Sequence, residues 1–458
     1  MLHYYHNRRA FSREQGGLFM ICNVLDFGAK GDNVTPDTAA IQSAIDACRQ
    51  NGGGKVVFPG GRVYRSGALI LCSDLELHFE MGAVLKGSDH IPDYALPLSS
   101  AGSAELRGIP SYEDCTYNGA PNYYFLYGKG CRNLAITGFG RIDGNEEIFY
   151  GTVTKWHIDG SFYPRVPMLF LENSAQISIR DVTFARSAFW TVHLVGCRDV
   201  LIDGIRILNN LRMANCDGID PDHCQNVRIS NCHIECADDC IVFKNTAAAM
   251  EYGPCENITV SNCTLTSTSA AIKFGSESEA LFRNILVENC CISRTNRGIS
   301  LQLRDKGSIE NVIFSNITID TRLFRPDMYW GQAEPIAITA LRRHEDSATG
   351  TIRNVRFQNI FCAAENGILL YAEDPAQISG ISFDHICLTL RTATDYPKGG
   401  HDLRPTIGAR STPPQPHYVY AHNASGVQFR DCAFGTAPDY PHRVETPHIF
   451  TNCTHIEI

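Results

Sequence analysis

The chain has 458 residues, of which 44% are hydrophobic and 19% charged, and its formal net charge is −9. Proteins that bind nucleic acid usually present a basic face, so this acidic balance argues against broad nucleic-acid binding. No apolar run reaches the roughly 18 residues that would predict a membrane span. We therefore expect a chain that binds neither nucleic acid nor membranes, while a local basic pocket could still hold an acidic ligand.

The first twenty residues show no secretion signal. They contain Arg8-Arg9 and a polar run at 12–15, but no apolar stretch of the length that secretion requires. We interpret residues 1–20 as a disordered extension, with Met20 as an alternative start. The 19 cysteines are then expected to be reduced in a cytoplasmic protein, because disulfide frameworks are typical of short secreted chains.

Residues 37–48 have the apolar spacing of an amphipathic helix, and Asp37 is placed to cap its N-terminus. A glycine run at 52–54 and a predicted strand at 55–59 follow. The ends of repeat stacks need a cap. We therefore expect this helix to cover the open end of a solenoid.

A phrase of the form Asn-apolar-x-apolar-x-Asn recurs along the middle of the chain. Its clearest copies lie at residues 225–231, 256–262, 283–289 and 310–316, with looser copies at 198–202 and 353–357. Equivalent positions are 27 to 31 residues apart, a period typical of solenoids, and each phrase alternates as a short strand does. The sequence predicts an all-β fold, a single-domain right-handed parallel β-helix over residues 21–458, with asparagine ladders at its turns and buried thiols packed between repeats.

Long insertions interrupt this repeat at about residues 88–126, 144–166, 322–350 and 392–422. Loops of this length usually shape a binding site or are disordered. We expect them to wall a cleft, with Trp330 in an aromatic rim. Arg342 and Arg343, in the same insertion, form a small basic patch close to this rim, and an ordinary pair of surface charges is the competing interpretation.

Two acidic clusters, at residues 215–220 and 237–240, supply Asp217, Asp238 and Asp239. Asp217 and Asp238 are 21 residues apart, about one turn of a solenoid whose rungs are about 4.8 Å apart. Carboxylates from neighbouring rungs would then face one cleft. An isolated aspartate is more often a turn residue, but three at this interval predict acid–base chemistry.

These clusters carry a resemblance to glycoside hydrolase family 28, the polygalacturonase family, over roughly residues 21–390. Residues 26–32, 37–42, 60–64, 140–144 and 189–193 also resemble that family. The resemblance implies an inverting hydrolase in which Asp238 is the general acid and Asp217 and Asp239 hold and deprotonate the water. Inversion ordinarily needs an acid and a base roughly 6.5–9.5 Å apart, which adjacent rungs are expected to supply. Clustered carboxylates raise one another's proton affinity, which keeps one of them protonated.

The chain departs from the family at two basic segments. Ala270 stands where the family has the histidine of a Gly-His-Gly segment, and Ser300 and Gln302 stand where an Arg-x-Lys segment grips a uronate carboxylate. The loss of both weakens the case for polygalacturonate itself as the substrate. Lys273 and Arg304 are the candidates to replace these groups, and a solvated charge on the outer face is the competing interpretation for each.

Other candidate substrate-binding residues are Trp190 and His193, because an aromatic face stacks on a pyranose and imidazole donates to hydroxyls. Core packing and a structural histidine are the competing interpretations. Asn215 and Lys244, beside the acidic clusters, complete the set. Residues 236–240 lack a second Cys or His pair at zinc spacing, so neither a metal nor a cofactor is predicted.

The favoured function is inverting hydrolysis of pectin-type oligosaccharides, galacturonide or rhamnogalacturonan fragments, with exo action. One alternative is a β-helix lyase that eliminates across a uronate with Ca²⁺, although the sequence has no calcium loop of alternating Asp ligands. Another is a non-catalytic carbohydrate-binding solenoid, because one scaffold hosts many functions. The sequence leaves the sugar, the linkage and the oligomeric state open.

Overall fold

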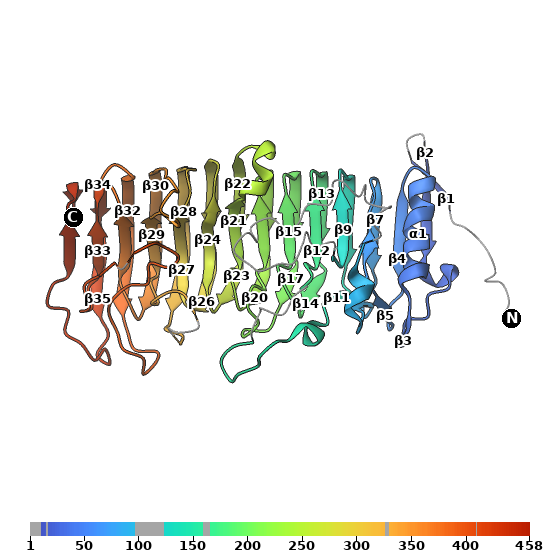
Figure 1. Ribbon diagram of the computed structural model, residues 1–458, viewed down its shortest axis with the longest axis horizontal. Helices are drawn as coiled ribbons and strands as arrows, with labels where there is room; N and C mark the ends of the chain where they lie inside the picture. Colours follow the sequence, from blue (N-terminus) through green and yellow to red (C-terminus); the bar gives the residue numbers. More distant parts are fainter. Residues whose placement is uncertain (1–10, 15–16, 97–122, 159–164, 326–328, 409) are drawn as a thin grey trace.

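A computed structural model of the chain describes residues 11–14, 17–96, 123–158, 165–325, 329–408 and 410–458. These residues form an elongated stack of short strands, with helix α1 (Thr38–Gln50) at one end and the C-terminus at the other (Figure 1). The strands pair in parallel, apart from the N-terminal hairpin of β1 (Phe11–Glu14) and β2 (Gly17–Asn23). The predicted all-β, right-handed parallel β-helix is confirmed.

Each turn of the solenoid contributes strands to three columns. The first column contains β2, β4 (Gly54–Phe58), β7 (Leu75–Phe79), β10 (Arg132–Gly138), β13 (Ala175–Arg180), β16 (Arg198–Asp203), β19 (Gln225–Ser230), β22 (Cys255–Ser261), β25 (Phe282–Glu288), β28 (Ile309–Thr321), β30 (Ile352–Ala364), β32 (Ile378–Leu390), β34 (Ala424–Arg430) and β37 (Thr454–Glu457). The second contains β3 (Asp32–Pro36), β5 (Val63–Ser66), β8 (Val84–Gly87), β11 (Arg141–Asp143), β14 (Thr183–Ala185), β17 (Arg206–Leu208), β20 (His233–Cys236), β23 (Thr264–Ser267), β26 (Cys291–Thr295), the second halves of β28, β30 and β32, and β35 (Ala433–Thr436).

The third column forms a separate sheet, and the candidate site lies on its outer face. It contains β6 (Leu69–Ile70), β9 (Leu126–Lys129), β12 (Leu169–Glu172), β15 (Val192–Val195), β18 (Ile219–Asp222), β21 (Ile241–Asn245), β24 (Ala270–Ser278), β27 (Arg297–Leu303), β29 (Ile336–Ala340), β31 (Ile368–Ala372), β33 (Val419–His422) and β36 (His448–Thr451). Short 3₁₀ helices are η1 (Val24–Phe27), η2 (Ile91–Tyr94), η3 (Glu146–Phe149) and η4 (Ala247–Tyr252).

The interior is a continuous apolar core that follows the alternation of the repeated phrase. In β19, for example, Val227 and Ile229 are buried while Asn226 and Arg228 are exposed. Cysteines fill part of this core, and those of the described chain are free thiols, most of them buried. None of the helices within the described ranges is long and apolar enough to span a bilayer.

Asparagine ladders run along two turns of the solenoid, as predicted. Asn316 donates to Asn289 at 3.2 Å and accepts from Asn359 at 2.7 Å, and its φ of 54° is left-handed. Asparagine tolerates this conformation because its short amide side chain bonds locally. The side-chain hydrogen bonds of the ladder therefore stabilise a turn conformation that other residues disfavour.

Asn316→Ala tests this account. The change removes both side-chain hydrogen bonds and places a Cβ-bearing residue without compensation in the left-handed region, so we expect a loss of about 1–2 kcal/mol in the free energy of unfolding. Chemical denaturation followed by circular dichroism measures it. Asn316→Gly is the matched control: it keeps the left-handed turn and should cost clearly less. Equal losses in the two variants would assign the whole effect to the hydrogen bonds.

Helix α1 forms where it was predicted and packs Ile41, Ala44 and Ile45 against the first strands. Asp37 occupies the N-cap position but makes no side-chain cap bond. Its carboxylate instead accepts from the backbone N–H groups of Lys30 and Gly31, at 2.6 and 3.0 Å. Asp37 therefore ties down the preceding loop, and the cap prediction is wrong in that detail.

The predicted domain boundary at residue 21 falls inside β2. Residues 1–10 and 15–16 of the expected disordered extension lie outside the described residues. Residues 11–14 and 17–20, by contrast, pair as the β1–β2 hairpin. β2 also pairs with β4 and so extends the first sheet column.

Candidate active site

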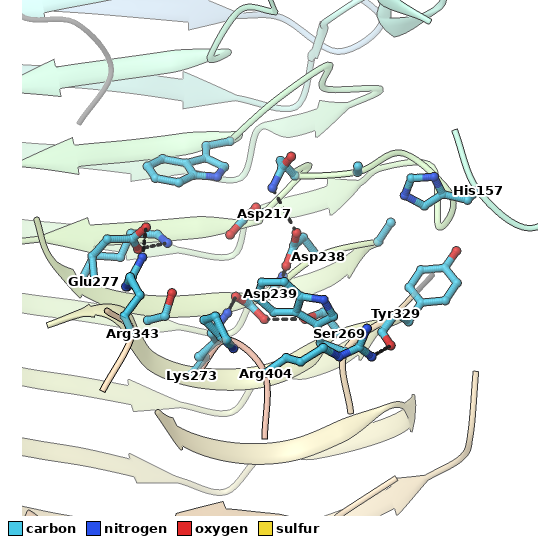
Figure 2. A pocket seen from close by; sticks show the side chains of 18 of the residues that line it. His157, Asp217, Asp238, Asp239, Ser269, Lys273, Glu277, Tyr329, Arg343 and Arg404 are labelled. Carbon is cyan, nitrogen blue, oxygen red and sulfur yellow. Dashed lines mark hydrogen bonds and ion pairs between the residues drawn. The ribbon is translucent and has the colours of Figure 1, made fainter. Parts of the chain in front are cut away.

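Three carboxyl groups meet at the centre of the third column. Asp217 precedes β18, and Asp238 and Asp239 precede β21, the next rung, where the Gly218 N–H donates to the Asp239 carbonyl at 2.9 Å. One oxygen of each of the three carboxyl groups lies within 4.8 Å of the others, and Figure 2 shows the groups converging. The prediction that neighbouring rungs bring these aspartates together is confirmed.

Their spacing is shorter than expected. The separation of roughly 6.5–9.5 Å ordinary for inverting enzymes is not reached, because the aspartates lie in directly adjacent rungs and point to the same spot. A gap of 4.8 Å between oxygens is nevertheless spanned by one water that makes two hydrogen bonds of about 2.7 Å. The trio can hold a single water between two of its members.

The trio also holds protons. Burial, followed by the charge of Asp239, raises the pKa of Asp238 to about 6. Burial and the neighbouring Asp238 raise the pKa of Asp217 well above its ordinary value, and Asp217 Oδ1 has no hydrogen-bond partner among the described residues. Like charges this close do not all ionise together. A proton is therefore available within the cluster at mildly acidic pH.

Asp239 has a different environment. Lys273 Nζ lies 2.7 Å from its Oδ2, while the Ser269 hydroxyl and the Ala270 N–H donate to its Oδ1 at 2.9 and 3.2 Å. Three donors, one of them charged, stabilise the ionised form of a carboxylate. Asp239 is thus the anionic member of the trio.

A cavity of about 560 Å³ opens above the trio. Three of the four predicted insertions contribute to its wall: His157 comes from 144–166, Tyr329 and Arg343 from 322–350, and Arg404 from 392–422. Most of the 88–126 insertion lies outside the described residues. The prediction that long insertions shape the cleft is confirmed for the three others.

These insertions are bonded to one another across the cleft. The Tyr329 hydroxyl donates to the Trp156 carbonyl at 2.5 Å, and Arg404 Nη2 donates to the Tyr329 carbonyl at 3.0 Å. Arg404 is itself held by Asp402, at 2.6 Å. We call Trp156, Tyr329, Asp402 and Arg404 the roof, which joins three segments far apart in the sequence.

The outer face of the third column is covered on both sides of the cleft. Towards the N-terminus, Tyr127 and Phe170 pack under Leu96 and η4 in an apolar cluster separate from the core. Towards the C-terminus, a second cluster places Leu403 over Tyr371 and its neighbours. Apolar packing thus covers the outer face of the third column before and after the rungs that carry the cavity.

Most of the predicted substrate-binding residues line this cavity: Trp190, Asn215, Lys244, Lys273 and Trp330. Trp190 is only 4% exposed, and Lys244 Nζ lies 4.3 Å from its ring centroid, so that the ammonium covers the indole face. Lys244 also pairs with Glu277 at 3.2 Å. Burial alone would lower the pKa of Lys244, but Glu277 and the aspartates raise it, and the residue is a fixed cation in the wall.

Two predicted binding residues do not reach the cavity. His193 is fully buried beneath Trp190, with Nε2 3.6 Å from Asp222. Arg304 is also fully buried and donates to the backbone carbonyls of Leu403 and Pro405. Neither side chain lines the cavity, because insertions and neighbouring aromatic rings cover these strand positions.

Ser300 and Gln302 are likewise buried under the 392–422 insertion, and Gln302 Nε2 donates to the Arg404 carbonyl at 2.6 Å. The hydrogen bond of Gln302 helps to hold the 392–422 insertion in place, and neither Ser300 nor Gln302 lines the cavity. Three arginines that were not among the predicted binding residues also line the cavity: Arg212, Arg343 and Arg404. The sequence left Arg343 open between a basic patch near the rim and a surface charge, and the path of its insertion places it in the cavity wall.

The carboxyl trio is the group of possible metal ligands found within the described residues. Its negative charge is already balanced by the Lys273 ammonium in direct contact and by Lys244 nearby. A resident cation would compete with both ammonium groups.

Comparisons with known sequences agree with this geometry. A model of glycosyl hydrolases family 28 matches residues 88–325, more than half of the chain, and a model described as rhamnogalacturonase A/epimerase, pectate lyase-like, matches residues 21–84. A "Probable polygalacturonase" of Vitis vinifera is 33% identical over 228 residues, which cover 49% of this chain and 44% of that protein. An exo-poly-alpha-D-galacturonosidase of Dickeya chrysanthemi is 39% identical over 127 residues, 27% of this chain and 19% of that one. The chain thus spans less than half the length of these curated relatives.

Among solved structures, the family 28 exopolygalacturonase of Yersinia enterocolitica superposes with a TM-score of 0.70 at 21% identity, over 96% of this chain and 78% of that one. This likeness concerns the fold. The match to the family model includes Asp217, Asp238, Asp239 and Lys273. The chain belongs to the glycosyl hydrolases of family 28.

Proposed function

We propose that the protein hydrolyses glycosidic bonds, with Asp238 as the general acid and a water held between Asp217 and Asp239 as the nucleophile. The observation that carries this proposal is the asymmetry of the trio: Asp239 is bonded to Lys273 at 2.7 Å, while the pKa of Asp238 is raised to about 6. An acid and an anionic base are thus present side by side. Direct attack by this water inverts the anomeric configuration.

The substrate that we propose is a pectin-type oligosaccharide, a galacturonide or rhamnogalacturonan fragment. Two features support it: the curated relatives are named for action on polygalacturonate or its oligomers, and the cavity wall is rich in cations. Among the lining residues, Arg212 has no carboxylate partner within the described part of the chain and donates to the Thr154 carbonyl. Such cations suit a ligand that carries carboxylates.

We further propose exo action. Two apolar clusters, one containing Leu96 and the other Leu403, cover the outer face of the third column before and after the cavity, and the roof crosses above it. A polymer that continued through the cleft in both directions would meet these barriers, whereas a chain end can enter a closed pocket. The enzyme is thus expected to remove residues from an end.

The test is incubation with homogalacturonan, oligogalacturonides and rhamnogalacturonan oligosaccharides, with products separated by chromatography and anomers followed by proton NMR. We expect a single small product from the start of the reaction, formed with inversion, while the viscosity of the polymer hardly changes. A rapid fall in viscosity would contradict exo action, and a retained anomer would make one aspartate a covalent nucleophile. An unsaturated product that depends on Ca²⁺ would favour the lyase, and binding without turnover would favour the carbohydrate-binding solenoid.

A further inference from the structure

The three catalytic carboxyl groups receive their hydrogen bonds unequally. Asp238 accepts from the Asn215 amide at 3.5 Å and from the N–H of Asp239 at 3.0 Å, both neutral donors. Asp239 accepts from the charged Lys273 Nζ at 2.7 Å as well as from Ser269 and the Ala270 backbone. The ion pair with Lys273 therefore distinguishes Asp239 from its neighbour Asp238.

We propose that Lys273 is a positioning residue that keeps Asp239 ionised and so leaves the shared proton of the trio on Asp238. This inference rests on the proposed hydrolysis, in which Asp238 must deliver a proton and Asp239 must accept one. Lys273 acts through Asp239 and has no need to touch the substrate. Ala270, three residues earlier in β24, offers only its backbone N–H to Asp239, so the charge at this place comes from Lys273.

The fold fixes Lys273 for this task. It lies on β24, in register with Val242 of β21 and Ser300 of β27, and its side chain is only 13% exposed. Figure 2 shows it approaching the trio from the side opposite Asp217. The two paired strands fix the backbone of Lys273, so its side chain starts from a fixed position beside Asp239.

The other charged groups around the trio do not share this contact. Lys244 pairs with Glu277 at 3.2 Å, and Arg343 lies 4.0 Å from Glu277 and 3.5 Å from Asp305. Within the described residues, the ion pair with Lys273 is the only one that any member of the trio makes. The ionisable groups that face the trio and therefore enter its titration are Asp220, Lys244, Lys273, Glu277, Arg297 and Tyr329.

The first measurement is the pH dependence of kcat for Lys273→Met and Lys273→Arg. Loss of a positive charge makes ionisation of nearby carboxyl groups harder, so both the acidic limb, set by the base, and the alkaline limb, set by the acid, should move to higher pH by about one unit or more. Activity on the acidic side should then fall about 10-fold or more. Lys273→Arg keeps the charge and should restore the position of both limbs. Lys306→Met, which removes an exposed lysine paired with Glu279, is the matched control and should shift neither limb.

A second measurement does not depend on turnover. In the unliganded protein with ¹³C-labelled aspartate, the carboxyl shift of Asp238 should report a transition near its pKa of about 6, while that of Asp239 stays the shift of an ionised carboxylate. In Lys273→Met the two carboxyl groups should share the proton, so that both shifts change through the same transition, and Lys306→Met should behave as the native protein. An Asp239 shift that stays ionised in Lys273→Met, or a uniform loss of kcat without movement of either limb, would overturn the role of Lys273. A shared transition in a protein that hydrolyses no glycan would uphold that role and reject the hydrolase proposal.

Discussion

Replacement of Asp238 by asparagine is expected to lower kcat by about 10³-fold while the protein stays folded. The amide cannot deliver a proton to the leaving oxygen, which is the step that we propose for Asp238. Its side chain makes few structural contacts, since it bonds to the Asn215 amide at 3.5 Å and to the next backbone N–H. Steady-state kinetics measure the loss of kcat, on the oligosaccharide that the native enzyme cleaves best. Thermal unfolding measures whether the variant stays folded.

The native enzyme offers a linked test through pH. Burial and the charge of Asp239 raise the pKa of Asp238 to about 6, and a general acid acts only while it carries its proton. The alkaline limb of kcat should therefore begin near pH 6, with activity falling as the pH rises. Asp431→Asn, at a side chain that is 77% exposed, is the control and should keep full activity. Retention of turnover by Asp238→Asn would transfer the role of acid to another group, with Asp217 the next to be substituted.

Glu334→Gln is expected to cost about 3–5 kcal/mol in the free energy of unfolding, because it breaks a fully buried charge network. Glu334 precedes β29 and accepts from Arg297 Nε and His401 Nδ1, each at 3.0 Å. Burial alone would raise its pKa, but Arg297 and His401 hold the pKa well below its ordinary value. Chemical denaturation measures the loss.

The histidines explain why the cost is large. His401 Nε2 lies 2.8 Å from His417 Nε2, and His417 Nδ1 lies 2.9 Å from the Gln415 carbonyl. A carbonyl only accepts, so His417 Nδ1 carries a hydrogen and its Nε2 accepts from His401. His401 then donates from both nitrogens, one of them to the Glu334 carboxylate, and is an imidazolium. Glu334→Gln would leave two buried cations, His401 and Arg297, without their counter-charge.

The same network anchors the roof, because Arg297 also donates to the Asp402 carbonyl. We therefore expect Glu334→Gln to raise KM as well as to destabilise the fold. The depressed pKa of Glu334 means that its contribution is complete above the ordinary glutamate pKa and is lost as the pH falls towards the folded value. The difference in the free energy of unfolding between the native protein and Glu334→Gln should therefore become smaller as the pH falls. Glu345→Gln, on the exposed part of the same insertion, is the control, and an equal effect there would refute the network account.

The repeated phrase predicted the fold because a solenoid is built from local periodicity. Positions such as Val227 and Ile229 face inward simply because a strand alternates, and the 27-residue spacing brings equivalent positions into register. The carboxyl trio was predictable for the same reason, since an interval of about one turn stacks residues. The spacing of the three carboxyl groups could not be predicted, because the direction of each side chain depends on the turn that precedes its strand.

The cleft itself could be predicted only in part. Lys273 was placed correctly in the cavity, but its contact with Asp239 emerged only from the pairing of β24 with β21. His193 and Arg304 lie outside the cavity lining, and the sequence does not show which strand positions an insertion will cover. The place of Arg343 stayed open in the sequence because nothing local fixes the path of a long loop.

The sequence by itself determined the solenoid, its capping helix, the asparagine ladders and the meeting of Asp217 with Asp238, because each follows from strand alternation and a repeat of fixed length. The tertiary structure alone decided which aspartate is bonded to a lysine, where the cations of the cavity stand and which insertions join above it. Those features depend on contacts between residues as far apart as Arg297 and Asp402. Contacts of that kind form only after the insertions have folded back across the rungs.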